Sequence, residues 1–106
     1  MIIVKPSKLT SLADAARLVL DGQTVLFGGS LLHRSPSAFA RELARQERRH
    51  LTFVKASAAY DLDLLCAAGC VETVHAGIVA MEGGFGLAPN YRAAVEQGTV
   101  HLVEHA

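Results

Sequence analysis

Apolar and polar positions along the chain alternate between a helical period and a strand-like period. Residues 12–20 place apolar side chains three or four positions apart, and Ser11 and Asp21-Gly22 supply a cap and a stop for a helix. Residues 23–27 form a short apolar run that is typical of a buried strand. The same alternation predicts further helices over 37–47, 61–68 and 89–96, and further strands over 51–54, 71–79 and 99–103.

This order of elements indicates the fold class. Strands that are apolar on both faces and joined by helices are typical of a parallel sheet. We therefore expect an α/β fold, an open parallel sheet with helices on both faces, built as a single domain over residues 1–106. Because the sequence stops directly after the last expected strand, we expect the domain to be truncated at its C-terminal end. Its apolar surface would then be covered by a partner chain or by a continuation.

Charge and composition exclude several classes of function. Ten basic and ten acidic side chains cancel, and the isoelectric point is near 7, which argues against a nucleic-acid partner. No apolar run approaches the roughly 20 residues that span a bilayer, so we expect no membrane partner. The start of the chain lacks the order of a signal peptide, which predicts a cytoplasmic protein.

Metal and redox chemistry find little support in the sequence. Cys66 and Cys70 lie four positions apart, which is neither the redox spacing nor half of an evident zinc site. We expect both to be buried, reduced thiols. The five histidines form no HExxH pattern, so we expect no metal site.

The first glycine loop, residues 28–36, is the most informative local signal. Gly28-Gly29-Ser30 follows directly on an expected strand, and open parallel sheets bind ligands beyond the carboxyl ends of their strands. Two interpretations remain open for Gly28 and Gly29. They could present backbone N–H groups as an oxyanion hole for a thioester or carboxylate, or they could form a plain tight turn. The spacing is neither a GxGxxG fingerprint nor a P-loop.

His33 and Arg34 lie in the same loop. A guanidinium there could clamp a carboxylate or a coenzyme phosphate, which makes Arg34 a candidate substrate-binding residue beside Ser30 and His33. The alternative for both is a role at the helix entry or at the surface.

The second glycine loop, residues 82–89, opens the last expected helix. Its candidate substrate-binding residues are Gly84, Phe85 and Gly86, because a helix N-terminus offers free amides to an anion. The alternative is a flexible loop that only starts the helix.

Glu104 ends the last expected strand and is either a solvated or a catalytic carboxylate. Since both loops follow strands, we expect them to share one edge of the sheet.

Three segments together resemble a known family. FGGSLLHRSP, DLDLLCAAG and FGLAPNYRAAVEQG resemble the α (A) subunit of family I coenzyme A transferases, particularly the glutaconate type, over essentially the whole chain. The resemblance implies ping-pong exchange of coenzyme A between carboxylic acids through an enzyme-bound glutamyl thioester. A coenzyme A thioester would be the substrate, with no bound cofactor. Family subunits of this type are more than twice as long.

The resemblance also implies a division of labour between two chains. In two-subunit members the attacking glutamate belongs to the second, β-type chain, in a Ser-Glu-Asn-Gly-like motif, and this sequence has no such motif. We therefore expect a β-type partner chain that carries the catalytic glutamate. Gly28, Gly29 and Ser30 would lie near the reacting carbonyl, and Arg34 near the acid.

Two alternatives to transfer remain open. A relative of the family hydrolyses a ring ketone of a coenzyme A thioester, and the resemblance would place its catalytic carboxylate at Glu104. The other alternative is a non-catalytic remnant of the fold that serves as a binding or assembly module.

Overall fold

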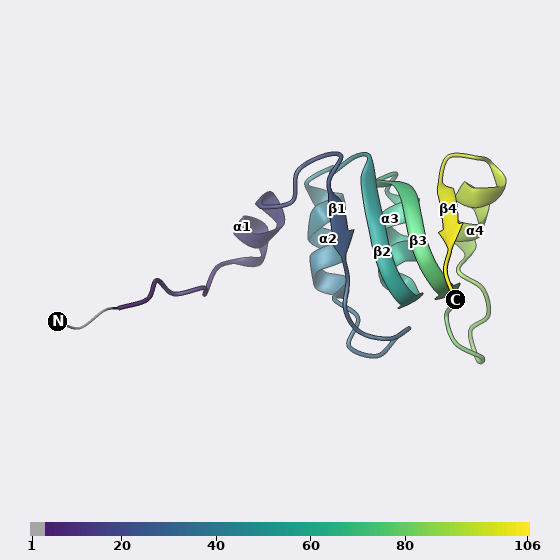
Figure 1. Ribbon diagram of the computed structural model, residues 1–106, viewed down its shortest axis with the longest axis horizontal. Coiled ribbons are helices and arrows are strands. Elements are labelled where there is room, and N and C mark those ends of the chain that lie inside the picture. The colour runs from purple at the N-terminus through teal and green to yellow at the C-terminus, as the bar shows by residue number, and fades with distance from the viewer. Residues whose placement is uncertain (1–3) are drawn as a thin grey trace.

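Four parallel strands form one sheet, and they lie side by side in chain order, β1-β2-β3-β4 (Figure 1). The computed structural model describes residues 4–106. The strands are β1 (Thr24–Leu26), β2 (Leu51–Ala58), β3 (Val71–Val79) and β4 (His101–Glu104). The helices are α1 (Leu12–Arg17), α2 (Ser37–Arg45), α3 (Tyr60–Ala67) and α4 (Pro89–Glu96).

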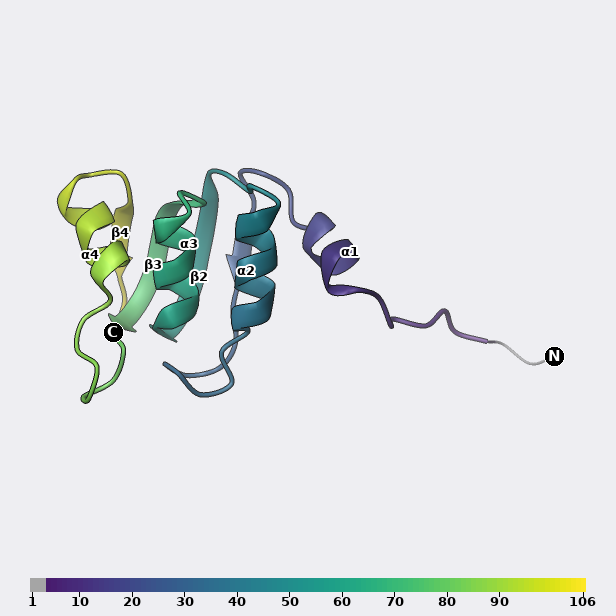
Figure 2. The same ribbon diagram turned by 180° about the vertical axis from the view of Figure 1, so that it is seen from behind.

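The connecting helices α2, α3 and α4 lie together on one face of the sheet. They stand behind the strands in Figure 1 and in front of them in Figure 2. The parallel α/β class is confirmed, but the expected second layer of helices is not present among residues 4–106. The strand order gives the reason: each strand is added beside the previous one, and crossovers of a single hand then put every helix on the same side. Helices on both faces require the strand order to reverse.

The core lies between the sheet and these three helices. Phe53 of β2 and Val74 of β3 are neighbours in register and are fully buried. Phe27 packs against Phe53 with ring centroids 4.9 Å apart. From the helices, Leu43 and Leu62 complete the layer. Each such fully buried side chain contributes about 1.5–3 kcal/mol relative to an exposed one.

Two elements differ most in length from the prediction. The first helix ends at Arg17 rather than near residue 20. The second strand runs to Ala58, through residues that we expected to form a loop. The small residues Ser57 and Ala58 pair with Ile78 and Val79 of β3. Lys55, in the middle of β2, is buried. Pairing in the sheet has therefore overridden the weak strand propensity of small residues.

Helix α3 carries two buried carboxylates near its N-terminus. Asp61 accepts a hydrogen bond from Lys55 Nζ at 2.7 Å. Asp63 accepts from the backbone N–H groups of Asn90 and Tyr91, both at 2.8 Å, and from Asn90 Nδ2 at 2.9 Å. Asp63 is therefore the N-terminal cap of α4, supplied by another helix, and it satisfies donors that α4 leaves unpaired.

Both cysteines are free, and Cys70 is fully buried while Cys66 is partly buried. Burial, followed by the charge of Asp63 and the neighbouring Cys70, raises the pKa of the Cys66 thiol to about 12. Burial also raises the pKa of Cys70. Thiols of this kind are poor nucleophiles. No helix among the described residues is long and apolar enough to cross a membrane.

Asp63→Ala is expected to destabilise the chain by about 1–2 kcal/mol, because it removes the cap that accepts from the amides of Asn90 and Tyr91. Chemical unfolding measures this loss. The control is Glu96→Ala, which removes an exposed ion pair to Arg92 on the same helix and is expected to change stability by less than about 1 kcal/mol. Equal effects of the two substitutions would contradict the capping role.

Alkylation tests the state of Cys66. At pH 8 the folded chain is expected to react with iodoacetamide at this residue roughly 10³-fold more slowly than the chain unfolded in guanidinium. The reason is that a pKa about three units above normal depletes the thiolate by that factor. Mass spectrometry of the Cys66 peptide gives both rates, and similar rates in the two states would show that the thiol is not protected.

Candidate functional site

The first glycine loop leaves the carboxyl end of β1 and is held against β2 at two points. Phe27 N donates to Val54 O at 3.0 Å, and Leu31 N donates to Ser57 O at 2.8 Å. Between these points the chain turns back on itself, since Ser30 and His33 exchange two backbone hydrogen bonds of 2.9 and 2.8 Å. The loop is thus a closed turn fixed to the edge at which parallel sheets bind ligands.

Two consecutive amides in this loop have no partner. Neither Gly28 N nor Gly29 N donates a hydrogen bond within residues 4–106, whereas the amides of Phe27, Ser30 and Leu31 all do. Gly28 and Gly29 are both exposed. The Ser35 hydroxyl at the end of the loop is buried and has no partner among the described residues. Unpaired donors at such a position are suited to receive the oxygen of a carbonyl or carboxylate.

Gly29 is required by the shape of the loop itself. Its φ is +88°, and a Cβ at this position would lie 2.3 Å from the carbonyl oxygen of Arg34. At Gly28 a Cβ would meet no atom within 4 Å. The tight-turn interpretation therefore accounts for the glycine at position 29. The oxyanion interpretation concerns the N–H groups and stays a prediction.

Two further residues of the loop adopt left-handed backbone conformations. The φ angles are 50° at Leu31 and 54° at Arg34. Non-glycine residues in this region cost of order 1–3 kcal/mol each, and such strain concentrates at functional sites. The side chain of Arg34 is exposed, so its guanidinium is free to meet a ligand or a partner, and its substrate-binding role stays a prediction.

The two glycine loops touch, as their positions after β1 and β3 predict. His33 Nε2 lies 3.0 Å from Glu82 Oε1, and the same oxygen is 3.4 Å from Leu32 N. The second loop closes on itself through Met81 N, which donates to Gly86 O at 2.9 Å. One carboxylate therefore joins the two loops, and the sequence offered no signal for it because Glu82 and His33 lie far apart along the chain.

The start of α4 is not an open anion site. The amides of Asn90 and Tyr91, which a ligand would have used, are bound by Asp63. Any contact of Gly84, Phe85 and Gly86 with a substrate must then come from the loop itself, where Phe85 is largely exposed. That role stays a prediction.

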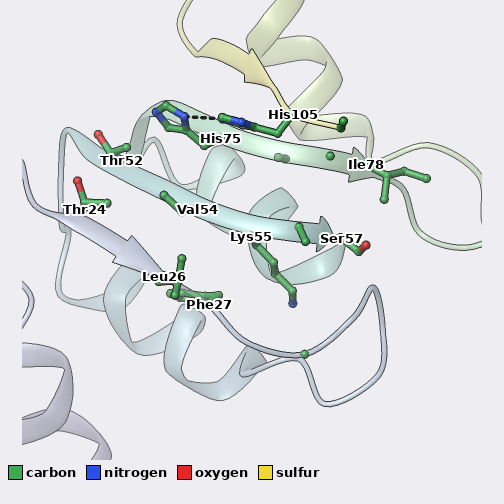
Figure 3. A pocket seen from close by; sticks show the side chains of 15 residues that line it. Thr24, Leu26, Phe27, Thr52, Val54, Lys55, Ser57, His75, Ile78 and His105 are labelled. Carbon is green, nitrogen blue, oxygen red and sulfur yellow. Dashed lines mark hydrogen bonds between the residues drawn. The ribbon is translucent and has the colours of Figure 1, made fainter.

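Two hollows lie at this part of the sheet. The larger is a groove of about 1010 Å³ on the face without helices, lined by Gly29, Val54 and Ser57 at one end and by His75 and His105 at the other (Figure 3). His75 Nδ1 and His105 Nε2 lie 3.0 Å apart. Among residues 4–106 no group of three or more His, Cys, Asp or Glu side chains is arranged to hold a metal ion.

Glu104 lines the smaller hollow, of about 290 Å³, together with Tyr91. Burial, followed by the charges of Cys66 and Glu104, raises the pKa of the Tyr91 hydroxyl. Ala76 pairs with Glu104 on one side and with Lys55 on the other, which puts the two charged residues on the same face, about 10 Å apart. Gly29 and Glu104 share the sheet edge but lie in different hollows. Sequence reasoning missed Lys55 and Tyr91, whose burial no local pattern shows.

A pair of substitutions separates the two glycines. Gly29→Ala is expected to destabilise the chain by at least about 1–2 kcal/mol, because alanine disfavours the left-handed region and its Cβ would strike Arg34 O. Gly28→Ala is the matched control and is expected to stay within about 0.5 kcal/mol of the wild type. Thermal melting of both variants checks this, and a tolerated Gly29→Ala would refute the loop geometry.

Comparisons with known proteins agree with this architecture. A model of the family described as Coenzyme A transferase matches residues 9–104. The chain is 38% identical over 77 residues to the cholesterol ring-cleaving hydrolase IpdA subunit of Mycobacterium tuberculosis (strain ATCC 25618 / H37Rv), covering 73% of this chain and 26% of the relative. To the IpdA subunit of Rhodococcus jostii it is 32% identical over 103 residues, covering 97% of this chain and 34% of that one.

Solved structures show the same likeness. Glutaconate coenzyme A-transferase from Acidaminococcus fermentans superposes with a TM-score of 0.87 at 29% identity, over 94% of this chain and 32% of that chain. A variant of the decarboxylase AibA/AibB superposes with a TM-score of 0.85 at 30% identity, over 92% and 38%. The chain thus spans about a quarter to a third of the curated relatives it matches. By its matching sequence and its fold, the chain belongs to the coenzyme A transferase family.

Proposed function

We propose that this chain is a subunit of a coenzyme A transferase that moves coenzyme A between carboxylic acids, with the glutamyl thioester carried by a partner chain. The observation that carries the proposal is the pair of unpaired amides at Gly28 and Gly29, held at the carboxyl edge of a sheet of this family. Attack of a carboxylate on a thioester puts negative charge on the carbonyl oxygen. Preorganised donors stabilise that charge where it develops.

The partner is proposed on chemical grounds. A ping-pong exchange needs a covalent nucleophile, and the carboxylates that support the two glycine loops are already engaged, while Glu104 lies in the separate, smaller hollow. Asp61 and Asp63 are buried in hydrogen bonds, and Glu82 joins the two loops. The chain would supply the loop that receives the thioester carbonyl, and Arg34 would meet the acid or a phosphate of the coenzyme.

A second candidate function is hydrolysis of a ring ketone of a coenzyme A thioester. Its support is the position of Glu104 in a hollow beside Tyr91, together with the likeness to ring-cleaving hydrolase subunits. In this case Glu104 would act as the general base that activates water. The same partner would be needed, but the chemistry would lie in the smaller hollow.

The complex purified through this chain from its native source tests both functions. We expect it to exchange coenzyme A between acetyl-coenzyme A and dicarboxylic acids, while the isolated chain shows no exchange because it lacks the covalent nucleophile. Steady turnover by the isolated chain after a second purification would contradict the division of labour.

Glu104→Gln separates transfer from hydrolysis. If the chain serves transfer, this substitution leaves most of the exchange rate intact, since Glu104 is outside the groove that Gly29 lines. If it serves hydrolysis, ring opening falls by about 10²-fold or more, as expected for loss of a general base. Glu96→Gln on the exposed face of α4 is the matched control. A complex that neither transfers nor hydrolyses would support a binding or assembly module.

A further inference from the structure

Lys55 and Asp61 form an ion pair that is closed to solvent. The Lys55 Nζ to Asp61 Oδ2 distance is 2.7 Å, and the side chains are 1% and 0% exposed. The other oxygen of Asp61 accepts from Leu62 N at 2.9 Å and from Ala59 N at 3.3 Å. The carboxylate thus joins three parts of the chain: the middle of β2, the turn after it and the first turn of α3.

Stability alone does not explain such a pair. Two charges taken out of water lose their hydration, and apolar residues of similar volume often replace a buried pair without loss of stability. Removing one partner, in contrast, leaves an uncompensated buried charge. A buried pair is therefore better suited to hold neighbouring segments in one arrangement than to stabilise the fold.

The place of Lys55 shows which segment it holds. The carbonyls that anchor the first glycine loop belong to Val54 and Ser57, the residues one before and two after Lys55. In Figure 3 the Lys55 side chain leaves β2 near the carboxyl end of the strand, the end at which this loop is anchored. Among residues 4–106, Asp61 is the one hydrogen-bond acceptor of the Nζ.

We propose that Lys55, fixed by Asp61, is the positioning residue of the first glycine loop. It holds β2 where the Ser57 carbonyl meets Leu31 N, and so sets the direction of the Gly28 and Gly29 amides. The inference rests on the proposed function for its purpose, because an oxyanion site needs its donors held within a fraction of an ångström. The position of the first glycine loop relative to β2 is a property of this chain, and it can be measured without a substrate.

The test uses two variants of the full chain. Lys55→Met alone leaves Asp61 buried and unpaired, so a general loss of stability is expected. Lys55→Met combined with Asp61→Asn removes both charges and keeps an oxygen for Ala59 N and Leu62 N. Amide hydrogen exchange followed by NMR reports on two protons: Leu31 N–H, which the pair is proposed to hold, and Thr52 N–H, which bonds Gln23 O at the far end of β2.

In the double variant, exchange at Leu31 is expected to rise about tenfold or more while exchange at Thr52 stays unchanged. Phe53→Leu is the matched control, since it weakens the core of the same strand and is expected to speed both amides together. If Leu31 keeps its protection, or if both amides change equally in the double variant, the proposal is overturned. Should the double variant fail to fold, the milder neutral pair Lys55→Gln with Asp61→Asn is measured at the same two amides, with the same outcomes.

This result is independent of the proposed function. The exchange experiment contains no thioester, so loss of Leu31 protection supports the positioning role even if the purified complex shows no coenzyme A transfer. Conversely, transfer by the complex together with unchanged Leu31 protection would keep the proposed function and refute the role of Lys55.

Discussion

Two buried carboxylates on the first turn of α3 determine how the candidate site is assembled. Asp61 binds Lys55 of β2, beside the points where the first glycine loop is anchored, and Asp63 binds the first amides of α4, where the second glycine loop ends. The two side chains face different neighbours although one residue separates them. The elements that hold the two loops are therefore both bound to α3. At the surface, His33 of the first loop contacts Glu82 of the second. A site that must hold donors in fixed directions gains from such support beneath it.

The order of the strands sets the second constraint. Because β1 to β4 are all parallel, their carboxyl ends form one edge, and the loops that follow β1 and β3 meet there. The same order places α2, α3 and α4 on one face and leaves the groove lined by Gly29 and Val54 on the other. Relatives with this architecture carry names that denote a transferase, a decarboxylase and ring-cleaving hydrolases. Proteins named for different chemistry thus share this architecture, as expected when function depends on local residues rather than on the fold.

Much of this was predictable from local patterns. The positions of all four strands, the glycine loops after two of them and their common edge follow from periodicity and from the geometry of parallel sheets. The one-sided helix layer was not, because apolar strands look alike whether helices or another surface cover their second face. The roles of Asp61 and Asp63 were not predictable either. Acidic residues are common in the first turn of a helix, because they interact favourably with the helix dipole. Lys55 was expected in a loop, since a lysine among small residues gives no sign of a buried partner six positions later.

The central claim is that the unpaired amides of Gly28 and Gly29 receive the carbonyl of a coenzyme A thioester. Hydrogen–deuterium exchange of the native complex, with and without a non-reactive thioether analogue of an acyl-coenzyme A, tests it most directly. We expect peptides covering 28–36 and 82–88 to lose exchange when the analogue binds, while peptides at the opposite edge, around Gly22 and Gly69, do not change. Binding of the analogue with no change at residues 28–36, or with protection confined to the opposite edge, would contradict the claim.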